Sequence, residues 1–191
     1  MPHGPPIVIL DACTLYPAAL RDVLMRLSLH GMIRARWTRA IHNEWIEAVL
    51  RDRPDLSSER LQRTRELMDL HAEGCLVTGY EKRIKNLRLP DRDDRHVLAA
   101  AIEAKANMIL TWNLRDFPNA ELTIHGLSAI TPDDLLAALL ESHRDKLIAI
   151  LREARLSLKQ PPRTATEYLA TLRTQGLSRT CALLVSVLSE L

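Results

Sequence analysis

Aromatic residues, cysteines and glycine-rich loops are scarce in this sequence, and each shortage limits what the protein can be. Phe, Trp and Tyr make up only 4% of the 191 residues, so the core must consist mainly of Leu, Ile, Val and Ala. The three cysteines, Cys13, Cys75 and Cys181, lie far apart and form no C-x-x-C pair, which favours reduced thiols in a cytoplasmic protein. The lack of a Gly-rich loop excludes a P-loop nucleotide-binding protein.

Long apolar runs and a strong net charge are absent as well. No stretch approaches the ~20 apolar residues that a membrane helix needs, so we expect no membrane association. The N-terminal segment MPHGPP has neither a charged region nor an apolar run, so we expect no signal peptide. A net charge of +2 is too small to indicate nucleic-acid binding by itself. A length of 191 residues fits one domain plus an extension, or two small domains, and the hydrophobic content of 47% is ample for a packed core.

Strand and helix signals alternate as far as residue 142. Short apolar runs predict strands at 7–10, 33–37, 75–78 and 108–111, and a fifth at 122–124. Helices are predicted at 15–29, 38–51, 57–72, 94–106 and 131–142, with an irregular basic link at 79–89. This alternation predicts an α/β fold with a central parallel sheet flanked by helices.

The last part of the chain has no strand pattern. Helices are predicted at 144–157, 164–175 and 177–191, with breaks at Pro161-Pro162 and at Gly176. Their apolar residues fall on stripes that must be buried against something. We therefore predict an α/β domain at 1–135 and an all-helical C-terminal extension at 136–191. We expect the extension to pack on the α/β core as a cap rather than to form a separate recognition domain.

Acidic residues stand where a stable core does not need them. Asp11 directly follows the first predicted strand, Asp94 lies in the first turn of a helix, and Asn113 and Asp116 follow the strand at 108–111. Ligands of parallel sheets bind beyond the carboxyl ends of the strands. If the strands at 7–10 and 108–111 are neighbours, three carboxylates and one amide meet at this edge.

Glu44 is the second unexpected acid. It falls three residues after Ile41 and four before Ala48, so we expect it on or beside the apolar face of its helix. An unpaired buried charge costs several kcal/mol, so Glu44 must be paired, protonated or functional, and its helix can bring it to the same edge. Two histidines, His42 and His96, flank these acids, and we expect both to point away from them.

Clustered carboxylates suggest a bound cation. At ~6 Å and an effective dielectric constant of ~20, one pair of like charges costs roughly 3 kcal/mol, and a divalent cation removes that cost. Ligation by oxygen alone suits Mg²⁺ or Mn²⁺ better than zinc. Metal ions held in this way most often serve phosphoryl chemistry, where they activate water and stabilise developing charge.

The motifs, taken in order, resemble those of the PIN-domain ribonucleases found as VapC-type toxins in bacterial toxin–antitoxin pairs. The matching segments are IVILDACTL at 7–15, Glu44 on its helix, DRHVLAAA at 94–101 and ILTWNLRDF at 109–117. Their order and spacing agree over roughly residues 5–135, and the helical tail resembles the extension of some longer members. The resemblance implies a PIN-like fold and a metal-dependent endoribonuclease that hydrolyses RNA. It also implies a toxin of a type II pair, with a cognate antitoxin and a homodimer as partners.

The resemblance also assigns residues. The metal-binding and catalytic acids of the family correspond to Asp11, Glu44, Asp94 and Asp116, with Mg²⁺ or Mn²⁺ as the metal. The hydroxyl and amide groups that surround them correspond to Thr14, Thr111 and Asn113. Basic residues near these acids form a rim that suits an RNA backbone, and we predict RNA contacts for Arg39, Lys85, Arg88, Arg92 and Arg95.

Other interpretations remain at this level. Asp11 alone can simply end a strand, Asp94 can be a first-turn acid favoured by the helix dipole, and Asp116 can be a turn residue. A haloacid-dehalogenase-like phosphatase is excluded because Cys13 occupies the position of its second aspartate. Cys13 is expected to be a small core residue, and Trp112 is expected to pack rather than to stack on RNA bases. The remaining alternative is a catalytically inactive PIN scaffold that binds RNA or protein.

Overall fold

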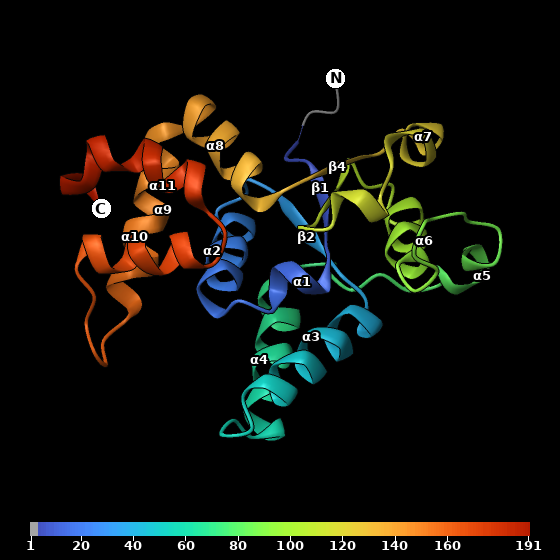
Figure 1. The fold of residues 1–191 in the computed structure, drawn as a ribbon, viewed down its shortest axis with the longest axis horizontal. Coiled ribbons are helices and arrows are strands. Elements are labelled where there is room, and N and C mark those ends of the chain that lie inside the picture. The colour runs from blue at the N-terminus through green and yellow to red at the C-terminus, as the bar shows by residue number, and fades with distance from the viewer. Residues whose placement is uncertain (1–3) are drawn as a thin grey trace.

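A parallel sheet of four strands lies at the centre of the molecule, which is a computed structural model describing residues 4–191 (Figure 1). The strands are β1 (Ile7–Leu10), β2 (Arg34–Arg36), β3 (Met108–Leu110) and β4 (Ser128–Ile130), in the order β2-β1-β3-β4. β1 and β3 are neighbours, with Leu10 opposite Leu110. The residues that follow these two strands therefore meet at one edge of the sheet, as expected.

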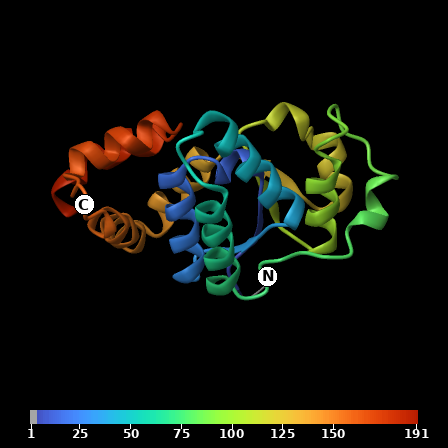
Figure 2. The same ribbon diagram turned by 90° about the horizontal axis from the view of Figure 1, so that it is seen from below.

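Helices cover both faces of the sheet, as the apolar character of the strands requires. They are α1 (Ala12–Leu15), α2 (Ala18–Leu29), α3 (Arg39–Asp52), α4 (Ser58–His71), α5 (Glu81–Ile84), α6 (Arg95–Glu103) and α7 (Asn119–Leu122). α6 packs against β1 and β3, and α2 packs against β2. In Figure 2, α2 and α4 lie on one side of the sheet and α6 on the other. The predicted fold class, a PIN-like parallel sheet flanked by helices, is confirmed.

Two predicted strands are wrong. Residues 75–78 are not a strand, and only Leu76 forms an isolated bridge, with Trp37. The segment Leu122–Ile124 ends α7 and enters a 3-10 turn (Thr123–His125), in which Leu122 is buried and Ile124 is exposed. Its apolar alternation reflects one buried side chain in a turn rather than a strand. The strand at this edge is β4, whose sequence Ser-Ala-Ile carries little strand signal.

Helix boundaries follow the predicted caps closely. The Thr38 hydroxyl accepts a hydrogen bond from Ile41 N at 3.1 Å and starts α3, and Thr131 starts α8 in the same way. The helix predicted at 15–29 is divided by Pro17 into α1 and α2. The link at 79–89 contains one short helix, α5.

The C-terminal part is helical and packs on the α/β core. It consists of α8 (Pro132–Ser142), α9 (Arg144–Ser157), α10 (Ala165–Thr174), α11 (Ser178–Leu184) and a 3-10 turn (Val185–Glu190). α9 and α10 both contact α2, and the Gln175 side chain accepts a hydrogen bond from Leu20 N at 2.9 Å. The boundary after residue 135 stays a prediction, and α8 runs across it.

Two further expectations concern membranes and the N-terminus. Over residues 4–191, no helix combines the length and the apolar character that a membrane crossing requires. Residues 1–3, the beginning of the segment for which no signal peptide is expected, lie outside the described residues.

Candidate active site

Asp11 is the most buried acid at the carboxyl edge of the sheet, with only 5% of its surface exposed. One carboxylate oxygen accepts a hydrogen bond from Ala12 N at 2.7 Å, so Asp11 caps α1. The other accepts from the Thr111 hydroxyl at 2.7 Å and from the Cys13 thiol at 3.0 Å. Because Thr111 directly follows β3, the pairing of β1 with β3 brings these groups together. Asp11 thus does more than end a strand.

Thr14 and Asn113 hold the backbone around Asp11 and Thr111. The buried Thr14 hydroxyl donates to the Asp11 carbonyl oxygen at 2.8 Å, so it fixes the main chain rather than the carboxylate. Asn113 N donates to the Thr111 hydroxyl at 3.0 Å, and its side chain is exposed. All three polar residues predicted around the acids therefore lie at this edge.

Cys13 was expected to be a core residue, and the structure gives it a place beside Asp11. Its thiol donates to the Asp11 carboxylate and accepts from Trp112 N at 3.3 Å. Burial, followed by the charge of Asp11, raises the pKa of the Cys13 thiol to about 12, so the thiol stays protonated and remains a donor. Its position two residues after a strand-ending acid was the available signal.

Asp94 lies among other carboxylates. Burial raises its pKa to about 6, and the charges of Asp11, Asp91 and Asp116 add to the increase, which His96 partly offsets. Asp94 occupies the position before α6, but its side chain makes no capping hydrogen bond. Asp94 therefore does not cap α6 through a side-chain hydrogen bond. The structure brings Asp11, Asp94 and Asp116 into one electrostatic environment, which also contains Asp91.

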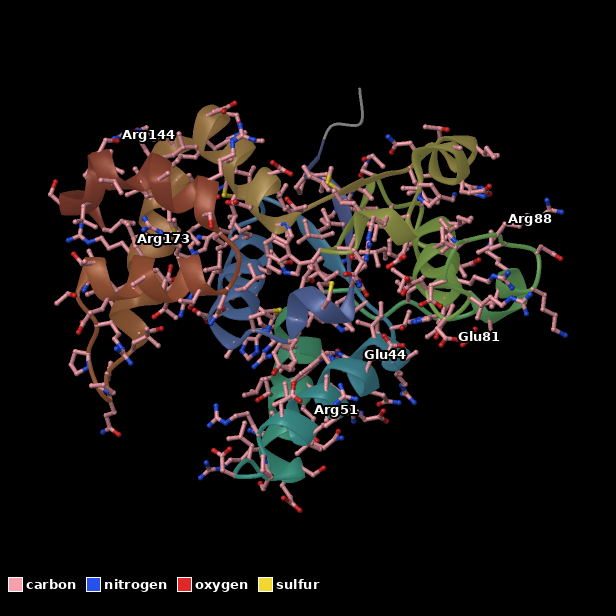
Figure 3. All side chains as sticks on the ribbon, in the orientation of Figure 1. Glu44, Arg51, Glu81, Arg88, Arg144 and Arg173 are labelled. Atoms are coloured by element: carbon pink, nitrogen blue, oxygen red, sulfur yellow. The ribbon has the colours of Figure 1, made fainter. Side chains whose placement is uncertain are left out.

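Glu44 is linked to the other acids by His96, which contacts Glu44 and also lies within the influence of the Asp11 and Asp94 charges. It lies on α3 with 44% of its side chain exposed, beside the apolar face rather than within it, and Figure 3 shows it on the side of α3 near α6. His96 Nε2 lies 2.8 Å from Glu44 Oε1, so the expectation that His96 points away is wrong. The two residues are far apart in sequence, and only the tertiary fold brings the side chains of α3 and α6 together here.

The two histidines differ in their surroundings. For His96, burial opposes protonation, but the hydrogen bond to Glu44 and the charges of Glu44, Asp11 and Asp94 outweigh it and raise its pKa. His42 is fully buried, lies 3.0 Å from Asp69 and accepts from the Trp45 indole N–H at 2.9 Å. Burial lowers the pKa of His42. His42 belongs to the core between α3 and α4 and points away from the acids, as expected.

The basic residues predicted to contact RNA lie on several separate elements. Arg39 is exposed on the first turn of α3, Arg92 is exposed before α6, and Arg95 is half-buried in α6. Lys85 is exposed just after α5. Figure 3 shows Arg88 at the outer edge of the molecule, beyond α6 and well away from Glu44. Arg88 lines a separate basic pocket together with Lys82 and His125.

The donor chemistry at this edge fits a hard divalent cation. Within residues 4–191, no three His, Cys, Asp or Glu side chains are close enough together to hold a metal ion directly. The carboxylates of Asp11, Asp94, Asp116 and Glu44 are oxygen donors of the kind that such a cation takes, and a cation would relieve the part of the raised pKa of Asp94 that comes, after burial, from the charges of Asp11, Asp91 and Asp116. This donor set suits Mg²⁺ or Mn²⁺, with waters completing the coordination.

The fold and this edge together define a PIN domain. A family model of the PIN domain matches residues 7–115, which is more than half of the chain, and the chain therefore belongs to the PIN-domain family. Proteins of this family are generally metal-dependent. A model described as the VapC50 C-terminal domain matches residues 132–186, which contain α8 to α11.

One curated relative extends the comparison. The chain is 35% identical over 82 residues to a protein described as "Putative ribonuclease VapC50" from Mycobacterium tuberculosis (strain ATCC 25618 / H37Rv). The match covers 43% of this chain and 48% of that protein, so it spans about half the length of the relative. No solved structure matches the chain. The predicted resemblance to PIN-domain, VapC-type proteins with a helical extension is confirmed.

Proposed function

We propose that this protein is an endoribonuclease that uses Mg²⁺ or Mn²⁺ to hydrolyse RNA phosphodiester bonds. The observation that carries the proposal is Asp94, a half-buried carboxylate placed among other carboxylates, with a pKa raised to about 6 and no capping role. Perturbed acids of this kind cluster at functional sites. The putative ribonuclease from M. tuberculosis supports RNA as the substrate.

The residues of the edge have distinct roles in this proposal. Asp11, Glu44, Asp94 and Asp116 would hold the metal, directly or through water, and the chemistry that a bound Mg²⁺ or Mn²⁺ would supply is activation of a water. Thr111 and Cys13 orient the Asp11 carboxylate, and Thr14 fixes its backbone. His96 holds Glu44 in place. Asn113 is exposed beside Thr111, where it can orient a water.

The predicted RNA contacts fall into two groups. Arg39, Arg92 and Arg95 lie on the helices that carry Glu44 and Asp94 or just before them, so they can position a phosphate backbone near the acids. Arg88 lies farther out and lines the basic pocket, and Lys85 is exposed just after α5, so these two residues can hold a strand that leaves the site.

Metal removal tests the proposal. Purified protein is incubated with single-stranded RNA and Mn²⁺, with and without EDTA, and cleavage is followed on a gel. Cleavage should require Mn²⁺ or Mg²⁺ and should be lost in Asp94→Asn. Asp93→Asn is the matched control, because it removes the same charge from an exposed neighbour. Cleavage that persists in EDTA contradicts the proposal, and metal-independent RNA binding without cleavage indicates the inactive scaffold.

We also propose that the protein is the toxin of a type II toxin–antitoxin pair. An apolar groove between α2 and α4 supports a protein partner, with a volume of about 410 Å³ and Met25, Leu29, Leu67 and Met68 in its lining. Leu29 and Leu67 are 56% and 40% exposed there. Such a groove suits an amphipathic antitoxin segment. Expression without an antitoxin should arrest growth, and Asp94→Asn should restore it. Unimpaired growth contradicts the toxin role.

A homodimer is the second partner that we propose. Family resemblance is its support, and the exposed apolar residues of α4, Leu67 and Leu70, offer surface for it. Light scattering on the purified protein should give twice the mass of one 21.6 kDa chain. A monomer at micromolar concentration contradicts it.

A further inference from the structure

Trp112 connects the two residues that hold Asp11. It directly follows Thr111, whose hydroxyl donates to the Asp11 carboxylate at 2.7 Å. Its own backbone N–H donates to the Cys13 sulfur at 3.3 Å, and that thiol is the other side-chain donor to the carboxylate. A displacement of Trp112 therefore changes both hydrogen bonds at once. The indole ring is half-buried against the core.

The surface on which the Trp112 ring rests comes from the C-terminal helices. Gly176, in the turn between α10 and α11, has a φ of +98°. A Cβ atom at Gly176 would lie 2.8 Å from Trp112 Cη2 and 2.9 Å from Cζ2, closer than any ordinary contact. The ring therefore lies directly against the backbone of the turn. Only glycine allows both the left-handed backbone and this close approach.

The turn is fixed on both sides. Before it, the Gln175 side chain accepts a hydrogen bond from Leu20 N at 2.9 Å, which ties the turn to α2. After it, Arg179 N and Thr180 N each donate to the Asp133 carboxylate at 2.8 Å, which ties the start of α11 to α8. An added Cβ would therefore displace the ring more readily than the turn.

We propose that the α10–α11 turn is a positioning element of the acidic site. The Gly176 backbone seats the Trp112 ring, and the ring fixes Thr111 and Cys13 against Asp11. This gives the helical extension a function in the α/β domain, and it rests on the proposed metal-dependent nuclease. Trp112 and Gly176 act through Thr111 and Cys13, so they are positioning residues.

The size of the expected effect follows from the geometry. Carbon atoms make ordinary contact at about 3.5 Å, so a Cβ at Gly176 would push the ring back by roughly 0.7 Å. Misplacing a catalytic group by ~1 Å can cost about 10²-fold in rate. We expect Gly176→Ala to lower cleavage by roughly 10–100-fold and to weaken Mn²⁺ binding.

The matched control is Gly31→Ala. Gly31 also stands one residue beyond the C-cap of a helix, with a φ of +66°, but a Cβ there meets nothing within 4 Å. It therefore carries backbone strain of the same kind without contact to Trp112. Trp112→Leu, alone and with Gly176→Ala, completes a double-mutant cycle, because removing the ring leaves the added methyl nothing to displace.

Three measurements are made on the full chain of each variant. They are the cleavage rate against Mn²⁺ concentration, Mn²⁺ binding by electron paramagnetic resonance of the free ion, and hydrogen exchange of residues 108–116 in metal-free buffer. Gly176→Ala should lose cleavage, Mn²⁺ affinity and exchange protection of this segment, whereas Gly31→Ala should keep all three. In the Trp112→Leu background, Gly176→Ala should cause no further loss.

The outcomes separate this inference from the proposed function. If the parent neither cleaves RNA nor binds Mn²⁺, the proposed function fails, while the exchange of residues 108–116 still decides whether the turn holds Trp112. Equal losses in Gly176→Ala and Gly31→Ala would overturn the inference, as would additive losses in the double variant. If Gly176→Ala does not fold, Trp112→Leu decides: unchanged Mn²⁺ affinity and exchange protection would overturn the inference.

Discussion

Two helices of this protein begin beside acidic residues whose carboxylates have opposite surroundings. At α8, both oxygens of Asp133 accept hydrogen bonds from backbone N–H groups of α11 at 2.8 Å, and Asp134 lies 3.1 Å from the Arg179 guanidinium. At α6, Asp94 makes no capping hydrogen bond and faces Asp11, Asp91 and Asp116. In the sequence, both helices have an acid near their start. In the structure, Asp133 joins α8 to α11, whereas Asp94 makes no such hydrogen bond and is available to a ligand.

The sharpest test of this contrast is to neutralise both acids. Asp94→Asn should lower Mn²⁺-dependent RNA cleavage by more than the ~10–100-fold expected when a residue that only supports a metal ligand is lost. Asp133→Asn keeps one acceptor oxygen for the backbone of α11, so it should lower cleavage far less than Asp94→Asn, and it should lower stability by about 1–2 kcal/mol through a lost charge-assisted hydrogen bond. Initial cleavage rates and urea unfolding of both variants provide the measurement. A comparable activity loss in both variants would contradict the distinction.

Deleting the last three helices tests how the C-terminal extension is attached to the α/β core. Truncation after residue 142 deletes α9 to α11 and uncovers α2, against which α9 and α10 pack. We expect the melting temperature to fall by about 10 °C, equivalent to ~3 kcal/mol for a chain of this size, and aggregation to increase. Differential scanning calorimetry and light scattering would show this. A truncated protein that melts at the parent's temperature would instead make the extension an independent module.

Some strands and site residues could be predicted from the sequence, and others could not. β1 and β3 could be predicted because they are apolar runs, each followed at once by polar residues, and their pairing followed from the expected parallel sheet. Asp11, Thr111 and Asp116 could then be placed at one edge. β4 could not, because Ser128–Ile130 has little strand preference and is held by β3 and the adjoining turn. Tertiary pairing, rather than local propensity, decides such short edge strands.

The parts of the site that were missed depend on contacts across the chain. His96 contacts Glu44 across two helices, α6 and α3, that are far apart in sequence, and no local pattern encodes that approach. From the sequence, Cys13 was expected to be a small core residue. Its hydrogen bonds with Asp11 and Trp112 depend on the turn from β1 into α1 and on the pairing of β1 with β3. The close approach of Gly176 to Trp112 links the extension to the α/β core. Gly176 was correctly predicted at the end of a helix, but its contact with Trp112 could not be predicted from the sequence.

A smaller effect is expected on the free energy of unfolding, which the charged form of Asp94 lowers because it is partly buried among other carboxylates. The folded state raises the pKa of Asp94 from 3.8 to about 6, so folding binds a proton between these values. The parent should therefore be most stable, relative to Asp94→Asn, below about pH 4, and should lose this advantage as the pH rises to about 6. At pH 7 in metal-free buffer, Asp94→Asn should be more stable by roughly 1–2 kcal/mol, a value discounted because the group is half-buried.

Urea unfolding of the parent and Asp94→Asn between pH 4 and 8 measures this difference. Added Mn²⁺ should raise the melting temperature of the parent more than that of the variant, because only the native state binds the ion. If Asp94 were a structural cap, the variant would lose up to ~1 kcal/mol at neutral pH, and Mn²⁺ would affect both proteins alike.

The smallest effect is expected where charges are already paired. Glu153 on α9 accepts a hydrogen bond from Arg26 of α2 and lies 2.8 Å from His30 Nε2, but it is 52% exposed. Exposed ion pairs contribute ~0–1 kcal/mol, because water and salt screen them and ordering the side chains costs entropy. Glu153→Gln keeps the shape and one acceptor, so it should lower stability by less than ~1 kcal/mol, and the loss should shrink in 1 M NaCl, where the Debye length falls to about 3 Å. RNA cleavage should not change. A loss of several kcal/mol would mean that this ion pair, rather than the buried Leu147, Ile150 and Leu151 of α9, attaches the extension to the core.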